Sequence, residues 1–126
     1  MLRGASVAIL GAAIVVGGCD RPSSVAEGQQ LYRGNGCATC HGPTGHGDGP
    51  IGKTLYPPPR DFRDARAFKN GTSLEAIAQT LEDGLTQDGS QMPRFDHLSR
   101  RERESLAMYV GFIRNQSNSE TSRRIP

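Results

Sequence analysis

The five residues Cys37-Ala38-Thr39-Cys40-His41 constrain this chain more than any other feature. C-x-x-C-H is the pattern through which a c-type haem is attached to protein. Two thiols on one helical turn can add to the two vinyl groups of a haem, and the adjacent imidazole can then bind the iron. The pattern therefore predicts that Cys37 and Cys40 carry one covalent haem c, with His41 as its proximal axial ligand.

Two other kinds of site also use closely spaced cysteines. A structural zinc site needs a second pair of ligands, and no further C-x-x-C or paired histidine follows in the sequence. A thioredoxin-like dithiol lies next to a βαβ pattern, which is absent here. Haem attachment is therefore the favoured interpretation, and a haem-free thiol protein or a structural lipoprotein is the alternative.

The N-terminal segment predicts export from the cytoplasm. Arg3 is followed by an uncharged apolar run from Ala5 to Val16 and then by small residues, as in a secretory signal peptide. A membrane-spanning helix needs about twenty apolar residues, so this run is short for a span. Residues 1–18 are therefore predicted to be a signal peptide.

A lipid anchor is predicted directly after this segment. Val16-Gly17-Gly18-Cys19 resembles the lipobox of bacterial lipoproteins, in which the cysteine is lipidated and becomes the new N-terminus. Lipidation would account for the third cysteine, since a free thiol is a liability in an oxidising compartment. An ordinary signal peptide or an uncleaved anchor with an incidental thiol is the alternative.

The residues after Cys19 extend this prediction to a location. Residues 19–24 would form the lipidated cysteine and a short linker. Asp20 resembles the signal for retention in the inner membrane. The domain is therefore expected at the bacterial inner (cytoplasmic) membrane, facing the periplasm.

The remainder of the chain predicts an all-α fold. Three capping boxes, in which Ser or Thr precedes Glu by three residues, occur at Ser24-x-x-Glu27, Thr72-x-x-Glu75 and Ser99-x-x-Glu102. The helices that they begin are predicted over residues 25–33, 73–83 and 100–115. The last carries an apolar stripe of Leu106, Tyr109, Val110 and Ile113. Glycine- and proline-rich loops connect the helices, and no segment alternates as a strand would.

Composition limits the partners and the extent of the domain. The chain has 15 Lys and Arg against 13 Asp and Glu, and Arg3 belongs to the predicted signal peptide. Such a balance gives no indication of nucleic-acid binding. Residues 116–126 are mainly Ser, Asn and Arg and are predicted to be a disordered tail. The folded domain would thus cover residues 25–115.

Residues 25–115 resemble class I monohaem c-type cytochromes. Gly28-x-x-Leu31-Tyr32 before the haem motif and Leu106-x-x-Tyr109 on the last helix match the paired terminal helices of that family. The resemblance implies a small cytochrome c-like helical domain wrapped around one covalently bound haem. A residue without Cβ at Gly28 would let the two helices cross closely, which agrees with the physical role of glycine.

The resemblance also implies roles for residues around the haem. Pro50 would accept, through its backbone carbonyl, the Nδ1 hydrogen of His41 and so fix the imidazole. Independently of the resemblance, Arg60 is a cation at the end of a stiff stretch of three prolines and is predicted to pair with a haem propionate. A turn proline and a solvated arginine are the respective alternatives.

The same resemblance implies the distal ligand. Met92-Pro93 matches the distal methionine of the family in order and context, and it follows a flexible loop over residues 84–91. His97 is the serious competitor. Met108 is more typical of helix packing, and His46 is more typical of a solvated loop. Met92 is therefore predicted to be the distal axial ligand.

His/Met ligation leaves no open position on the iron and predicts a one-electron carrier rather than an enzyme. Electron donor and acceptor would be membrane-associated redox proteins, because a short tether raises the effective concentration of such partners. The expected role is to shuttle electrons between respiratory complexes. A cluster of basic residues would steer an acidic partner or form an ordinary solvated surface: Arg94, Arg100, Arg101 and Arg103. The alternative function is a haem-containing sensor or enzyme subunit with a labile sixth ligand.

Overall fold

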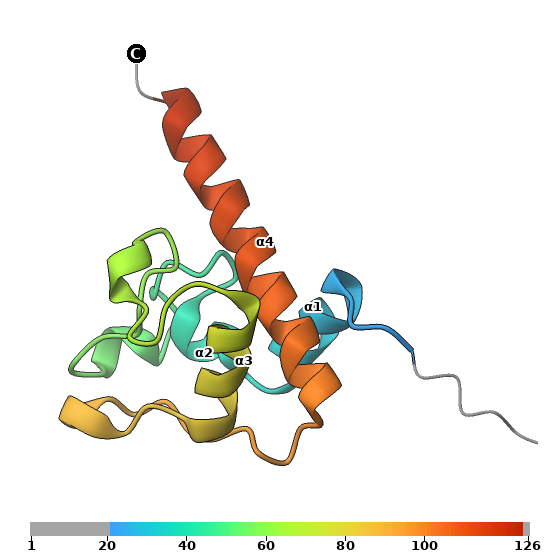
Figure 1. Ribbon diagram of the computed structural model, residues 1–126. Helices are drawn as coiled ribbons and strands as arrows, with labels where there is room; N and C mark the ends of the chain where they lie inside the picture. Colours follow the sequence, from blue (N-terminus) through green and yellow to red (C-terminus); the bar gives the residue numbers. More distant parts are fainter. Residues whose placement is uncertain (1–20, 125–126) are drawn as a thin grey trace, which may run out of the picture.

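The computed structural model describes residues 21–124. The predicted signal peptide, Cys19 and Asp20 lie outside the described residues, as do residues 125 and 126. Within the described part, the α-helices are α1 (Val25–Gly34), α2 (Cys37–His41), α3 (Leu74–Asp83) and α4 (Arg100–Arg124). Three short 3-10 helices lie in the loops: η1 (Gly52–Thr54), η2 (Ala65–Ala67) and η3 (Gln87–Gly89). Extended pairing among these residues is limited to one bridge, between Leu85 and Met92, so the predicted all-α fold is confirmed (Figure 1).

The three helix starts follow the predicted capping chemistry to different extents. At α4 the box is complete, because Ser99 Oγ accepts from the Glu102 amide while the Glu102 carboxylate accepts from the Ser99 amide at 2.8 Å. At α1 the Ser24 side chain accepts from the Glu27 amide, but the Glu27 carboxylate turns away from the helix start. Only half of that box therefore forms.

The predicted start of α3 is wrong by one residue. Ser73, rather than Thr72, is the N-cap, and its hydroxyl accepts from the Ala76 amide at 3.1 Å. Thr72 and Ser73 both carry a hydroxyl group that can cap a helix, and Ser73 does so in the structure. In the structure Ile77, Ala78 and Leu81 face the core.

Helices α1 and α4 cross at Gly28. A Cβ atom on Gly28 would lie 1.9 Å from the carbonyl oxygen of Ser105 and 2.8 Å from Cβ of Tyr109. Such distances exclude any other residue unless the helices move apart. The close crossing expected from the glycine is confirmed.

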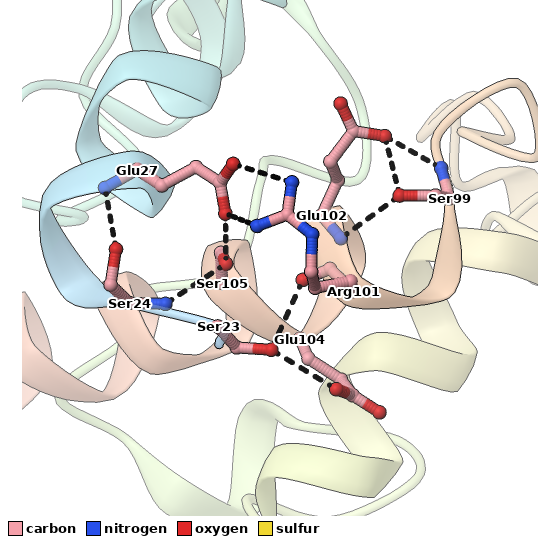
Figure 2. A network of polar contacts seen from close by, with 8 residues as sticks. All are labelled: Ser23, Ser24, Glu27, Ser99, Arg101, Glu102, Glu104 and Ser105. Atoms are coloured by element: carbon pink, nitrogen blue, oxygen red, sulfur yellow. Dashed lines mark hydrogen bonds and ion pairs between the residues drawn. The ribbon is translucent and has the colours of Figure 1, made fainter. Parts of the chain in front are cut away.

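A polar network lies beside this crossing (Figure 2). The Glu27 carboxylate accepts two hydrogen bonds from the Arg101 guanidinium, at 2.5 and 2.8 Å, and one from the Ser105 hydroxyl at 2.6 Å. Ser105 Oγ in turn accepts from the Ser24 amide. Glu27 has thus exchanged its capping role for a link between α1 and α4, which is the reason for the incomplete box.

The described chain begins in contact with α4. Ser23 Oγ lies 3.1 Å from a carboxylate oxygen of Glu104 and 3.4 Å from the Arg101 carbonyl (Figure 2). The last two residues of the predicted linker (19–24), Ser23 and Ser24, are therefore hydrogen-bonded to the first turns of α4.

At the other end, α4 continues through Arg124, so the predicted disordered tail is wrong for residues 116–124. Figure 1 shows this part of α4 extending beyond the other elements. Ser117 is buried, and its hydroxyl donates to the Thr44 carbonyl at 3.2 Å. Polar composition alone indicated disorder, but no glycine or proline interrupts residues 112–124, and extending an existing helix costs far less than nucleating one.

The core lies between α4, α1 and α3. Its buried apolar residues include Tyr32, Phe62, Ile77, Leu81, Leu98, Leu106, Tyr109, Val110 and Ile113. In the region from residue 21 to residue 124, no helix is both long enough and apolar enough to span a bilayer.

Candidate haem site

The loop after α2 holds the C-x-x-C-H turn in place. Three loop amides donate to the last carbonyls of α2: Gly47 to His41 at 2.9 Å, Gly49 to Cys40 at 3.1 Å, and Ile51 to Thr39 at 3.0 Å. The last carbonyls of a helix have no partner within the helix itself. The glycine-rich segment therefore completes this short helix and fixes its orientation.

Tyr32 connects the same turn to the helix crossing. Its hydroxyl donates to the Gly42 carbonyl at 2.7 Å, and its ring packs edge-to-face on Tyr109 with 5.3 Å between centroids. Burial raises the pKa of Tyr32, so the hydroxyl stays protonated and remains a donor. The scaffold of α1 and α4 is thus joined directly to the C-terminal end of α2.

The two motif cysteines form no disulfide with a described residue, and both are partly buried. Burial raises the pKa of Cys37 to about 11, and the neighbouring Cys40 adds to this shift. Cys37 lines both of the cavities described below, and Cys40 lines one of them. Two unpaired thiols one turn apart at a cavity wall are the donor set that covalent haem attachment requires.

His41 is held in its neutral form. Burial lowers the pKa of the imidazole, and the backbone of Arg60 opposes this shift in part. The ring packs on Phe62, with 4.8 Å between centroids and a tilt of 31°. Neutral imidazole is the form that binds metals, so the environment of His41 suits an axial ligand.

The predicted hydrogen bond from His41 to Pro50 is not formed. Nδ1 of His41 is buried and has no partner at hydrogen-bonding geometry, and the backbone group that influences its pKa belongs to Arg60. Pro50 itself is exposed. Its neighbours on both sides donate to carbonyls of α2, which keeps this turn against the helix backbone rather than the imidazole.

Two cavities adjoin α2 and share five lining residues: Cys37, His41, Arg60, Leu85 and Met92. The rest of the first wall is largely apolar and includes Phe62, Phe68, Ile77, Leu81, Leu106 and Val110. Three prolines, at positions 57–59, line the second cavity. Thiols, imidazole and apolar walls together fit a haem.

Met92 lies on the wall of both cavities, as His41 does. Its backbone pairs with Leu85 in both directions: the Leu85 amide donates to the Met92 carbonyl at 2.9 Å, and the Met92 amide donates to the Leu85 carbonyl at 3.0 Å. Lys69 also forms an ion pair with Asp88 near the tip of the loop. The loop expected to be flexible is therefore closed at its base and attached at its tip.

The competing ligands lie elsewhere. His97 is exposed, with Nε2 3.4 Å from Oδ1 of Asn35, and it lines neither cavity. Met108 and His46 also line neither cavity. Among the described residues, no group of three or more His, Cys, Asp or Glu side chains is arranged to hold a metal ion.

Arg60 lines both cavities and forms no ion pair with a described residue. The charge of Arg60 helps to lower the pKa of Asp88, after the larger effect of the hydrogen bond from Lys69. The position at the cavity wall is compatible with the predicted partner, a haem propionate, and the pairing stays a prediction.

The basic cluster predicted near the Met92 loop is not an open cationic surface. Each of its four members has an acidic partner: Arg94 with Asp96, Arg100 with Glu104, Arg101 with Glu27, and Arg103 with Glu82. Of the two interpretations that the sequence allowed, the pairing disfavours a surface that steers an acidic partner. Arg103 is also buried, which an ordinary solvated surface does not explain.

Phe62 and Leu85 are among the wall residues that the sequence did not indicate. Phe62 stacks on His41, and its amide donates to the Gly45 carbonyl at 2.7 Å. Neither residue lies in a helix or a motif, so periodicity gave no signal for them. The glycine at position 45 was the available clue for Phe62, because a Cβ there would lie 2.3 Å from the ring.

A small all-α domain that presents two thiols and an imidazole of C-x-x-C-H at an apolar cavity has the architecture of a c-type haem protein. The family model for cytochrome c matches residues 25–112, and the chain belongs to this family. Its cofactor is covalent haem c, and its general role is that of a haem electron carrier. A comparison with curated proteins gives no match.

Proposed function

We propose that this cytochrome c is a one-electron carrier in which His41 and Met92 bind the two faces of the haem iron. The observation that carries the proposal is that both residues line the same two cavities, whereas His46, His97 and Met108 line neither. A haem bound in this way cycles between two oxidation states without binding substrate. The chain supplies a buried neutral imidazole on one side and a thioether on a closed loop on the other.

Replacing Met92→Ala in the holoprotein tests the ligation. Loss of the thioether should abolish the far-red charge-transfer band of the ferric protein, and the reduced protein should bind carbon monoxide. The reduction potential should fall by more than about 59 mV, a factor of ten in the redox equilibrium, because the soft thioether favours Fe(II).

Met108→Ala is the matched control, because Met108 lies on α4 away from both cavities. It should keep the band and the potential. A wild-type protein that lacks the band and binds carbon monoxide rapidly would instead indicate a sensor or an enzyme subunit with a labile sixth ligand. An unchanged potential in the Met92 variant would exclude Met92 as the ligand.

We further propose that lipidation of Cys19 anchors the domain to the inner membrane on the periplasmic side, where it shuttles electrons between membrane-associated respiratory complexes. The support is the lipobox in the sequence and the position of Ser23, which contacts α4 and follows Cys19 by four residues. A tether of this length would keep the domain near partners in the membrane plane.

Cys19→Ser should move the protein from the membrane to the soluble fraction without loss of haem, since the haem thiols are untouched. Mass spectrometry of the N-terminal peptide of the mature wild-type protein should detect an acylated Cys19. Unchanged fractionation of the variant, with an unmodified wild-type peptide, would reject the anchor.

A further inference from the structure

Arg103 interrupts the apolar face of α4. It precedes Leu106 and Val110 by three and seven residues, and these two residues line the first cavity. Its side chain is only 9% exposed. A guanidinium at such a position is costly unless it is paired and hydrogen-bonded, so its partners indicate what it does there.

The partners of Arg103 lie on both sides of the Met92 loop. Its guanidinium donates to the Leu98 carbonyl, on the segment that leads from Met92 into α4. It also donates to Oε2 of Glu82 at 2.8 Å, in the last turn of α3 just before the loop begins. The Arg103 side chain therefore connects the end of α3 with the last residue of segment 84–98, which carries Met92.

Two further hydrogen bonds hold the residues that follow Met92 against α3. Nε of Arg94 donates to the backbone carbonyl of Glu82 at 3.3 Å, and the Phe95 amide donates to the Leu81 carbonyl at 2.7 Å. The segment after Met92 is thereby laid along the end of α3. The mutual backbone pairing of Leu85 and Met92 closes the same loop a few residues away.

We propose that Arg103 is a positioning residue that holds the Met92 segment against α3 through Glu82 and Leu98 and so keeps the thioether of Met92 on the iron. The inference rests on the proposed ligation by Met92. A pair that serves only general stability is the competing explanation, and it makes a different prediction. The Glu82 side chain is 43% exposed, so water can solvate it when Arg103 is removed. An apolar residue in place of Arg103 would continue the stripe of α4, but it leaves the Leu98 carbonyl without this donor, and removing one partner of a pair usually lowers stability.

The test is Arg103→Met in the holoprotein. Imidazole should bind the ferric haem about tenfold faster, equivalent to about 1.4 kcal/mol, because the thioether leaves the iron more often. The far-red band should weaken, and the amides of Leu85 and Met92 should exchange hydrogen faster. These three changes should be seen in the folded protein without denaturant, whether or not the denaturant midpoint falls, whereas a purely structural pair predicts a lower midpoint alone.

Arg100→Met is the matched control, with the same substitution on the same helix in an exposed pair with Glu104. Its imidazole-binding rate should equal that of the wild type. Glu82→Gln weakens the same contact from the other side, so its effect and that of Arg103→Met should be strongly non-additive in a double-mutant cycle. If the Arg103→Met variant does not fold, the imidazole-binding rate of Glu82→Gln tests the proposal instead.

The proposal is overturned if Arg103→Met and Glu82→Gln bind imidazole at the rate of Arg100→Met with an unchanged band. It is likewise overturned if the only change is a lower denaturant midpoint. A wild-type protein without the far-red band would instead contradict the ligation by Met92, so the two failures are distinguishable.

Discussion

The two sides of the haem cavity are built in different ways. On the proximal side, the crossing of α1 and α4 is a steric contact at Gly28, reinforced by the network around Glu27 and by the Tyr32 hydroxyl on the haem helix. On the distal side, Met92 lies on a loop with a single backbone bridge, one ion pair near its tip and one just before its start. The first region is defined by close packing and the second by a few directional contacts. Substitutions at the crossing should therefore destabilise the fold, whereas substitutions in the loop should mainly weaken binding of the distal ligand.

Gly28→Ala should have the largest effect. The new methyl group would lie 1.9 Å from a backbone oxygen of α4, which no side-chain movement can relieve. Overpacking typically costs about 1–3 kcal/mol and sometimes more, and a backbone obstacle belongs at the upper end of that range. Denaturant unfolding monitored by far-UV circular dichroism should show the loss.

Gly111→Ala is the control for this variant. Gly111 lies in α4, and a Cβ there would meet no other part of the fold within 4 Å, so alanine should stabilise the helix by about 0.5–1 kcal/mol. Equal stability of the two alanine variants would contradict a steric crossing at Gly28.

The proximal side was also the more predictable of the two. The haem helix was indicated by its motif, the limits of α1 and α4 near Ser24 and Ser99 by capping residues, and the crossing by Gly28. Each of these signals is local in the sequence or follows from a missing side chain. The burial of Arg103 could not be predicted, because its partner Glu82 lies 21 residues away and charge clustering is usually a surface property.

The remaining errors have similar causes. The Pro50 prediction assigned a carbonyl partner to His41 from the resemblance to related cytochromes, but the path of this glycine-rich loop is decided by its contacts with α2. The tail was predicted to be disordered from its composition. Its residue Ser117 contacts Thr44, which lies 73 residues earlier in the sequence. Non-local polar contacts leave no period or motif that a sequence could reveal.

Gly84→Ala tests the distal side and should have an intermediate effect. Gly84 has φ +69° and ψ −176°, a conformation almost confined to glycine, and a Cβ there would lie 2.9 Å from the Met92 carbonyl. The strain is on the order of 1–3 kcal/mol. The helices should persist by circular dichroism, while the far-red band of the ferric protein weakens.

Gly71→Ala provides the comparison for Gly84→Ala. Gly71 also has a positive φ, +96°, but a Cβ there would have its nearest contact, Ala76, at 3.9 Å. It should lose some stability and keep the band. A variant at Gly84 that unfolds as completely as Gly28→Ala would show that the loop is part of the scaffold, contrary to the contrast drawn above.

Glu27→Gln should have the smallest effect on stability, and this effect should depend on pH. Hydrogen bonds from Arg101 and then Ser105 hold the pKa of Glu27 below its ordinary value of 4.5. A lowered pKa in the folded state stabilises the protein above pH 4.5, and this contribution is lost as the pH falls through the lowered value. The denaturant midpoint of the wild type should therefore exceed that of Glu27→Gln at pH 7, and the difference should shrink below pH 4.5.

Added salt distinguishes which contacts of Glu27 cause the difference in denaturant midpoint between the wild type and Glu27→Gln. The Arg101 and Glu27 side chains are 35% and 19% exposed, so part of their attraction should be screened by added salt, whereas the hydrogen bond from Ser105 should persist. Glu120→Gln, at an exposed position of α4 with no ion pair among the described residues, should show neither dependence. If the difference between wild type and Glu27→Gln were the same at every pH, the carboxylate would not act through its charge, and the crossing would depend on packing at Gly28 alone.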